Sequence, residues 1–240
     1  MTGIGSGKVM NLDLNQAADH VKIMNRITAK TIGINSAART TCVKPAGTTS
    51  LVLGTSSGIH AWHNKYYIRR MRVGKNEAIY SYLAMHHPEL VQDEYFRPHD
   101  TAVIEIPQAA PKGSIIRTES AFDLLERVKL VANDWVKAGH RKGSNTHNVS
   151  ATISLKDKEW EQAGEWMWEN RNNYNGLSVL PYDGGTYTQA PFEDITKAKY
   201  NEMTRLISGI DLTKVVELND NTDLSGELAC AGGSCEVTSL

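Results

Sequence analysis

Two cysteines near the end of the sequence have a spacing that suits thiol–disulfide exchange. Cys230 and Cys235 flank the small residues Ala231-Gly232-Gly233-Ser234. The glycines allow the chain to fold back so that the two sulfurs meet, and such a pair can pass electrons between two partners. Half a zinc site and two incidental thiols are the alternatives, although no other cysteine pair completes a zinc site. The pattern favours redox exchange.

A second candidate is the turn Pro45–Ser50, which is rich in small residues and hydroxyl groups. It consists of Pro45, Ala46, Gly47, Thr48, Thr49 and Ser50. Small residues let an anion approach the backbone, and the N–H groups of a turn before a helix point toward it. The P-loop motif is absent. The turn therefore indicates either a phosphate-binding loop or a strand-to-helix turn with a threonine N-cap.

Two further stretches have side chains that could contact an anionic ligand. His60–Lys75 is basic and aromatic and contains no acid, which suits nucleotide phosphates or an acidic partner. A solvated strand and loop is the favoured interpretation. His147 ends the polar loop His140–His147, for which a structural role is also favoured. Cys42 is expected to be a small buried hydrophobe rather than a nucleophile.

The composition excludes several function classes. The 240 residues include 26 Lys and Arg against 27 Asp and Glu, a net charge of −1, which argues against general binding to nucleic acid or membrane surfaces. No apolar run approaches the ~20 residues of a membrane span, and Met1–Lys8 lacks the apolar core of a signal peptide. Three cysteines cannot form a disulfide scaffold, so a cytoplasmic location is expected.

Alternating helices and strands must position these residues. Apolar spacing and end signals predict helices over residues 13–32, 76–86, 120–138, 157–170 and 196–208. Short strands are expected over residues 40–44, 101–106, 148–155 and 177–180. This alternation indicates the α/β class. After Gly209 the pattern decays into acidic residues and glycines, so residues 1–209 are expected to form the folded domain and 210–240 a flexible acidic tail.

Several separated motifs occur in a recognisable order along the chain. They are Thr41–Leu51, Ser57–His60, Tyr66–Arg70, Asn145–Ser150, Gly164–Asn170 and Gln189–Glu193. Together they resemble the C-terminal part of the catalytic chain of adenosylcobalamin-dependent (class II) ribonucleotide reductase. The resemblance runs from Thr2 to the C-terminus. It implies a ten-stranded α/β barrel, to which this chain would supply the later strands and helices.

The same resemblance implies roles for the candidate residues. The turn Pro45–Ser50 would hold the substrate phosphates. The pair Cys230 and Cys235 would be the tail dithiol, which reduces the active-site disulfide after each turnover and is recharged by thioredoxin. His147 is a candidate for a residue that faces cobalamin. The expected reaction is radical reduction of ribonucleotides to deoxyribonucleotides, with no direct contact to nucleic acid or membrane.

Other features of that family have no counterpart in this sequence. The radical-bearing cysteine of an Asn-Pro-Cys-x-Glu type loop is absent, as are two further oxidisable cysteines, the specificity domain and the earlier barrel strands. Met1–Ile4 resembles a point in the middle of the family sequence. We therefore expect one piece of a split reductase or of a longer chain, inactive without an N-terminal half.

Two alternatives to this interpretation stay open. In the first, the chain is part of a class I large chain, which pairs with an iron subunit through adjacent tyrosines near its C-terminal strand. No such pair occurs around Leu177–Tyr182, whereas Tyr66 and Tyr67 match a class II pattern, so cobalamin is favoured. In the second, the chain is a decayed, non-catalytic nucleotide-binding or regulatory module. The intact dithiol argues against that reading.

Overall fold

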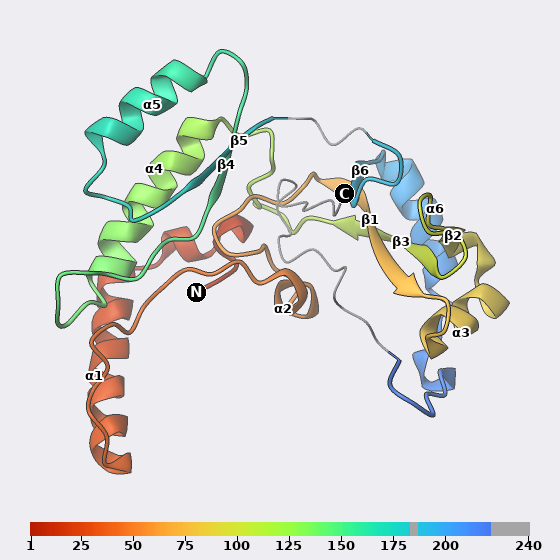
Figure 1. The fold of residues 1–240 in the computed structure, drawn as a ribbon, viewed down its shortest axis with the longest axis horizontal. Coiled ribbons are helices and arrows are strands. Elements are labelled where there is room, and N and C mark those ends of the chain that lie inside the picture. Colours follow the sequence, from red (N-terminus) through yellow and green to blue (C-terminus); the bar gives the residue numbers. More distant parts are fainter. Residues whose placement is uncertain (183–186, 222–240) are drawn as a thin grey trace. The chain divides into compact units, whose positions relative to one another are not determined.

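A computed structural model describes residues 1–182 and 187–221 (Figure 1). These residues divide into two compact units. Unit 1 contains residues 1–62 and 111–182, and unit 2 contains residues 63–110 and 187–221. In the described part of the chain, no helix combines the length and the apolar character needed to cross a bilayer.

Unit 1 is mainly helical, with one short pair of strands. Its elements are η1 (Ile4–Ser6), η2 (Val9–Asn11), α1 (Leu14–Ile32), α2 (Gly47–Val52), α4 (Ala121–Val131), the π-helical turn η4 (Ala132–Lys137), β4 (Thr152–Leu155), α5 (Trp160–Glu169) and β5 (Ser178–Pro181). Strands β4 and β5 pair in parallel, with Thr152 opposite Ser178. Helix α4 packs against β4 (Figure 1). The apolar face of α4 and the inward side of β4 form the core, which includes Leu125, Val128, Val131, Ile153 and Leu155.

Capping residues explain where the unit 1 helices α1 and α4 begin and where α1 ends. The Asp13 carboxylate accepts the Gln16 N–H at 2.9 Å, and Gly33 closes α1 in the left-handed region with φ 74°. Ser120 and Asp123 form a reciprocal capping box at the start of α4. Such caps satisfy backbone groups that have no partner inside a helix.

Unit 2 is an antiparallel sheet with two helices. Its elements are β1 (Tyr66–Gly74), α3 (Ala78–His86), η3 (Pro88–Leu90), β2 (Val91–Asp93), β3 (Thr101–Ala109), β6 (Phe192–Asp194), α6 (Lys197–Ile207) and η5 (Leu212–Lys214). The strand order is β2-β3-β1-β6. β1 and β3 pair over their full lengths, and α6 packs on both (Figure 1). Val73, Tyr82, Leu83, Ala102 and Ile104 form the core.

The structure confirms the predicted helices to within a few residues. It shortens the predicted strand 148–155 to Thr152–Leu155 and corrects three further details. Residues 40–44 form no strand; Val43 makes only an isolated bridge to Val149. The predicted helix 120–138 changes into the π-helical turn η4 at Ala132. Strand β3 does not end at Pro107 but continues to Ala109. Beyond Ile104, β3 has a neighbour on one side only, and proline is tolerated at such edge positions.

Helices and strands in both units confirm the α/β class. The ten-stranded barrel stays a prediction, as does the boundary at residue 209. Ile210 and Val215 pack against the core of unit 2, and the Asp211 N–H donates to the Tyr82 hydroxyl at 3.1 Å. Residues 222–240 of the predicted tail lie outside the described residues.

Candidate functional site

Only Pro45 and Ala46 of the segment Pro45–Ser50 precede helix α2, and Gly47–Ser50 form its first turn. The N-cap is Ala46, with no side-chain cap, so the expected threonine N-cap is wrong. The Ala46 N–H donates to the Ser57 hydroxyl oxygen at 2.9 Å, and the Ser50 hydroxyl donates to the Gly47 carbonyl at 3.1 Å. Ser50 is buried, whereas Thr49 is exposed. Thr48 directly precedes Thr49 in the first turn of α2. Since the Ser50 hydroxyl already has an internal partner, Thr49 and the free N–H groups of that first helical turn are the groups of this segment left for an anion.

The imidazole of His60, three residues after Ser57, is buried. Its Nδ1 lies 3.2 Å from the Ser57 carbonyl oxygen, and its Nε2 accepts the Thr152 N–H at 3.0 Å. Burial lowers the pKa of His60; the hydrogen bond with Ser57 acts in the opposite direction, and the positive charge of Arg127 lowers the pKa further. His60 therefore connects the segment after the turn to strand β4 as a neutral ring.

His147 is exposed, but its loop is fixed on both sides. Its Nδ1 lies 3.0 Å from the Thr41 carbonyl oxygen, which fits Nδ1–H as the donor and leaves Nε2 free to accept. The Asn175 amide donates to the carbonyls of Thr146 and His147 at 3.0 and 2.9 Å. The Asn148 amide donates to the Gly176 carbonyl at 3.0 Å. The imidazole of His147 is therefore exposed to solvent while hydrogen bonds fix its orientation.

The segment that supports His147 also closes the π-helical turn η4. The Thr41 hydroxyl is 2.7 Å from the Trp135 carbonyl oxygen and 3.2 Å from that of Val136. The Trp135 indole N–H donates to the Cys42 carbonyl at 3.1 Å. A wide π turn leaves carbonyls without regular partners, and such turns are frequent at functional sites. Thr41 and Cys42 therefore bond to η4 rather than to a neighbouring strand.

The cysteines are placed differently from one another. Cys42 is half-buried and makes no disulfide within the described residues. The predicted redox pair Cys230 and Cys235 lies outside the described residues. No group of three or more His, Cys, Asp or Glu side chains that could hold a metal ion occurs in residues 1–182 and 187–221.

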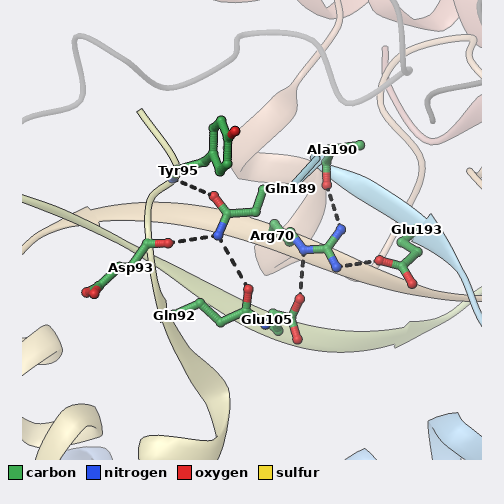
Figure 2. Close-up of polar contacts among 8 residues, drawn as sticks. All are labelled: Arg70, Gln92, Asp93, Tyr95, Glu105, Gln189, Ala190 and Glu193. Carbon is green, nitrogen blue, oxygen red and sulfur yellow. Dashed lines mark hydrogen bonds and ion pairs between the residues drawn. The ribbon is translucent and has the colours of Figure 1, made fainter. Parts of the chain in front are cut away.

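The basic stretch His60–Lys75 contains strand β1, and acidic side chains from other strands neutralise part of it. Arg70 contacts the carboxylates of Glu105 (2.7 Å) and Glu193 and the carbonyl of Ala190 (3.0 Å), as Figure 2 shows. Burial alone would lower the pKa of Arg70, but its hydrogen bonds with Glu193 and Glu105 raise it. These ion pairs favour a structural role for the basic stretch over phosphate binding. Its arginines lie on a paired strand of the sheet rather than in a solvated loop.

Two further pairs continue this pattern at the end of β1 and just after it. Arg72 lies 3.4 Å from Glu94, and Lys75 lies 2.5 Å from Asp93. The Gln189 amide supports the same edge, because it accepts the Tyr95 N–H at 2.9 Å and donates to the Asp93 carbonyl at 2.8 Å (Figure 2). Gln189 holds a positive φ of 54°. These contacts join residues 189–193 to β1 and β2.

One buried ion pair was not predicted from the sequence. Arg127 on α4 makes a two-pronged contact with Glu119, at 2.8 and 2.7 Å. Arg127 lies among Leu124, Val128 and Val131 on the apolar stripe of α4, and all of them are buried. A charged residue on an apolar stripe needs a buried partner. The position of Arg127 within the stripe was therefore the sequence signal for a buried ion pair.

No protein-family profile matches the chain. Individual proteins do match it. An adenosylcobalamin-dependent ribonucleoside-triphosphate reductase from Lactobacillus delbrueckii is 27% identical over 217 residues, which covers 87% of this chain and 28% of that protein. A Euglena gracilis protein of the same name is 30% identical over 211 residues, with 84% and 27% covered. A Dictyostelium discoideum protein, a probable enzyme of the same kind, is 27% identical over 233 residues, with 91% and 28% covered.

A solved structure matches as well. The crystal structure of a B12-dependent class II ribonucleotide reductase gives a TM-score of 0.71 at 22% identity, covering 93% of this chain and 35% of that one. At that identity the match establishes the fold. The chain spans less than a third of the length of the curated relatives it matches. The resemblance noted in the sequence is thus confirmed: over most of its length the chain is similar to one part of the adenosylcobalamin-dependent ribonucleotide reductase chain.

Proposed function

We propose that this chain is the C-terminal piece of a ribonucleotide reductase that converts ribonucleoside triphosphates to deoxyribonucleotides by radical chemistry. One observation carries the proposal. Sequence similarity to a probable reductase and structural similarity to a class II reductase each cover about nine-tenths of the chain. Triphosphates are the substrates named for the relatives, so we extend that substrate class to this chain.

In this proposal the turn Pro45–Ser50 holds the substrate phosphates. The exposed Thr49 and the half-buried Gly47 leave the surface of the turn open to an anion, while Ser50 anchors it from below. The basic stretch takes no part, because Arg70, Arg72 and Lys75 are paired with carboxylates. Phosphate recognition therefore depends on backbone N–H groups and hydroxyls more than on a cluster of free cations.

The proposed cofactor is adenosylcobalamin, as the names of the relatives state for those proteins. When bound, it supplies the radical chemistry. His147 fits a contact with such a group, because it is exposed, its backbone is held by Asn175, and its Nδ1 bond to Thr41 leaves Nε2 free to accept. We assign His147 a positioning contact with the cofactor and no part in the chemistry.

Cys230 and Cys235 complete the proposed cycle. In their reduced form they give two electrons and two protons to an active-site disulfide, which becomes a dithiol while they become a disulfide. A thioredoxin-type dithiol then reduces them and is itself oxidised. The disulfide that they reduce belongs to the part of the enzyme that this chain lacks, so an N-terminal half is required.

One face of α1 has exposed apolar side chains among the described residues, which supports the requirement for a further piece. Leu14, Ala18 and Ala29 are buried on one side of this helix. On the opposite side Ile23, Met24 and Ile27 are 50%, 46% and 53% exposed. An apolar stripe of this kind indicates a surface that binds another protein surface, which the missing part of the reductase would provide.

The proposal is tested by the native mass of the tagged chain purified from its own cells, with peptide mapping of anything bound. A stable partner with an Asn-Pro-Cys-x-Glu loop, active with adenosylcobalamin and a ribonucleoside triphosphate, would support a split reductase. A longer covalent product would place these residues in a larger chain. A solitary chain of 26.5 kDa that binds neither cofactor nor nucleotide would contradict the proposal. A solitary chain that binds nucleotide alone would favour a non-catalytic module.

A further inference from the structure

Two buried side chains connect the turn Pro45–Ser50 to strand β4. The hydroxyl oxygen of Ser57 accepts the Ala46 N–H at 2.9 Å. The carbonyl oxygen of the same serine lies 3.2 Å from His60 Nδ1, and His60 Nε2 accepts the Thr152 N–H at 3.0 Å. A continuous line of hydrogen bonds therefore runs from the first peptide of the turn to the first residue of β4.

The protonation of His60 is fixed by these two contacts. A ring nitrogen that accepts an N–H must be unprotonated, so Nε2 is bare and Nδ1 carries the hydrogen. Ser57 and His60 are only 4% and 8% exposed, so water cannot easily replace either partner. The imidazole acts as a spacer of fixed length between Ser57 and Thr152. Protonation of Nε2 would remove the acceptor and break the line.

The backbone around Ser57 is packed closely against the turn. A Cβ atom added to Gly58, which has a φ of 57°, would lie 3.0 Å from the Lys44 carbonyl oxygen. The Gly58 N–H and carbonyl are also engaged, with the Thr2 hydroxyl at 2.7 Å and the Ile4 N–H at 2.9 Å. Residues 57–60 thus form a supported platform beneath the beginning of the turn.

We propose that Ser57 and His60 are positioning residues for the phosphate-binding turn. Neither touches the substrate; Ser57 fixes the direction of the Ala46 peptide, and His60 fixes Ser57 to β4. The inference rests on the proposed phosphate role of the turn and adds residues that set its geometry. Because an anion bound by N–H groups depends on their direction, a loosened Ala46 peptide should weaken triphosphate binding without any change in the groups that contact it.

The test compares four versions of the full chain, each in complex with the N-terminal half that the proposed function requires: unaltered, Ser57→Ala, Ser57→Thr and Ser120→Ala. Ser57→Ala removes the acceptor for the Ala46 N–H, while Ser57→Thr keeps a hydroxyl. Ser120→Ala is the matched control, because it removes a helix cap in the same unit far along the chain from the turn. Two quantities are measured for each: amide hydrogen exchange of residues 46–50, and the Kd for CTP by calorimetry.

Ser57→Ala should speed exchange at residues 46–50 and raise the Kd for CTP by about tenfold, which is ~1.4 kcal/mol. Ser57→Thr should restore both, and Ser120→Ala should change neither, although it also lowers stability. Equal effects of Ser57→Ala and Ser120→Ala would overturn the inference, as would unchanged exchange in Ser57→Ala. If the unaltered chain binds no CTP, the phosphate role of the turn itself fails. If it binds CTP and Ser57→Ala binds equally well, only the positioning role fails.

A His60→Phe variant extends the test to the second residue. It keeps a ring of similar size but removes both the donor and the acceptor. We expect the same faster exchange at residues 46–50 and the same weaker CTP binding as in Ser57→Ala. Because the two residues act in one line, Ser57→Ala and His60→Phe together should weaken binding no more than the stronger single change. Additive effects would show that His60 does not act through Ser57 and would overturn that step.

Discussion

The carboxylate of Glu119 and the guanidinium of Arg127 form a two-pronged ion pair inside unit 1, with nitrogen–oxygen distances of 2.7 and 2.8 Å. The side chains are 13% and 7% exposed. Arg127 lies on the core face of α4, and Glu119 directly precedes the cap of that helix. The pair therefore fixes the entry of the chain into α4 and places a positive charge near His60.

Breaking this pair should be strongly destabilising. Glu119→Gln leaves a buried guanidinium without its counter-charge, so we expect the free energy of unfolding in urea to fall by about 3–5 kcal/mol. Asp19→Asn serves as the control, because it removes the more exposed Asp19–Lys22 pair and should change stability by no more than ~0.5 kcal/mol. Replacing both partners with apolar residues, as Glu119→Leu with Arg127→Met, should recover most of the loss. Equal effects of Glu119→Gln and Asp19→Asn would contradict the buried pair.

The buried His60 predicts how stability depends on pH. Its pKa is lower in the folded chain than the ordinary value of 6.5, so between these two values the unfolded chain binds more protons than the folded one. Stability from this group is therefore complete above about pH 6.5 and is lost as the pH falls toward the folded pKa. Urea unfolding from about pH 8 to pH 5 should show this loss in the unaltered chain and a shallower slope in His60→Phe. A steeper fall of stability with decreasing pH in His60→Phe would refute the role of His60 in this pH dependence.

Two glycines should respond in opposite ways to the same substitution. A Cβ atom at Gly139 would lie 1.9 Å from the Thr41 hydroxyl oxygen, and that hydroxyl caps the Trp135 carbonyl. Gly139→Ala should therefore destabilise the chain by about 1–3 kcal/mol. Gly164 lies in the interior of α5 with no atom within 4 Å of the added Cβ, so Gly164→Ala should stabilise by ~0.5–1 kcal/mol. Thermal unfolding of both variants measures these changes in stability. A change in the same direction for both would contradict the difference in space around the two glycines.

Helix positions were largely predictable from the sequence because their signals are local. Asp13 and Gly33 mark the two ends of α1 within one turn of the residues that they cap. Strand β1 was harder to place, because Arg69, Arg70 and Arg72 resemble a solvated segment until their partners are known. Those partners, such as Glu105 and Glu193, lie 35 and 123 residues away along the chain, and a single sequence does not pair them.

In the candidate site, too, local features could be predicted from the sequence and long-range contacts could not. The composition of Pro45–Ser50 indicated a turn before a helix, and α2 begins there. The line from Ala46 through Ser57 and His60 to Thr152 could not be predicted, since its last bond joins residues that are 92 positions apart. Likewise, residues 40–44 have β-forming side chains, but Thr41 bonds to η4 and Val43 pairs with residues 148–150 only as an isolated bridge, so no strand forms. Hydrophobic periodicity does not reveal the π turn of η4.

Arg70 should be important for the attachment of β6. Its guanidinium contacts Glu105, Glu193 and the Ala190 carbonyl at the same time (Figure 2), whereas a lysine ammonium lacks the planar fork that this requires. Arg70→Lys should lower the stability of unit 2 by about 1.5–3 kcal/mol and speed amide exchange in residues 192–194. CTP binding should be unaffected, because the pairing removes Arg70 from phosphate recognition. A selective loss of CTP affinity with normal exchange would instead assign this basic stretch to the substrate.

The proposed electron path makes a prediction about Cys230 in the complete enzyme. Cys230→Ser leaves Cys235 without the partner thiol needed to form a disulfide, so two electrons can no longer be passed in one step. Turnover supported by thioredoxin should be abolished, while a single turnover from a pre-reduced active site should proceed at the normal rate. Cys42→Ser is the matched control, since Cys42 is half-buried and lies in the segment that caps η4, and it should leave both assays unchanged. Multiple turnover that persists in Cys230→Ser would exclude the shuttle, whereas loss of the single turnover as well would indicate that the serine disturbs the active site itself.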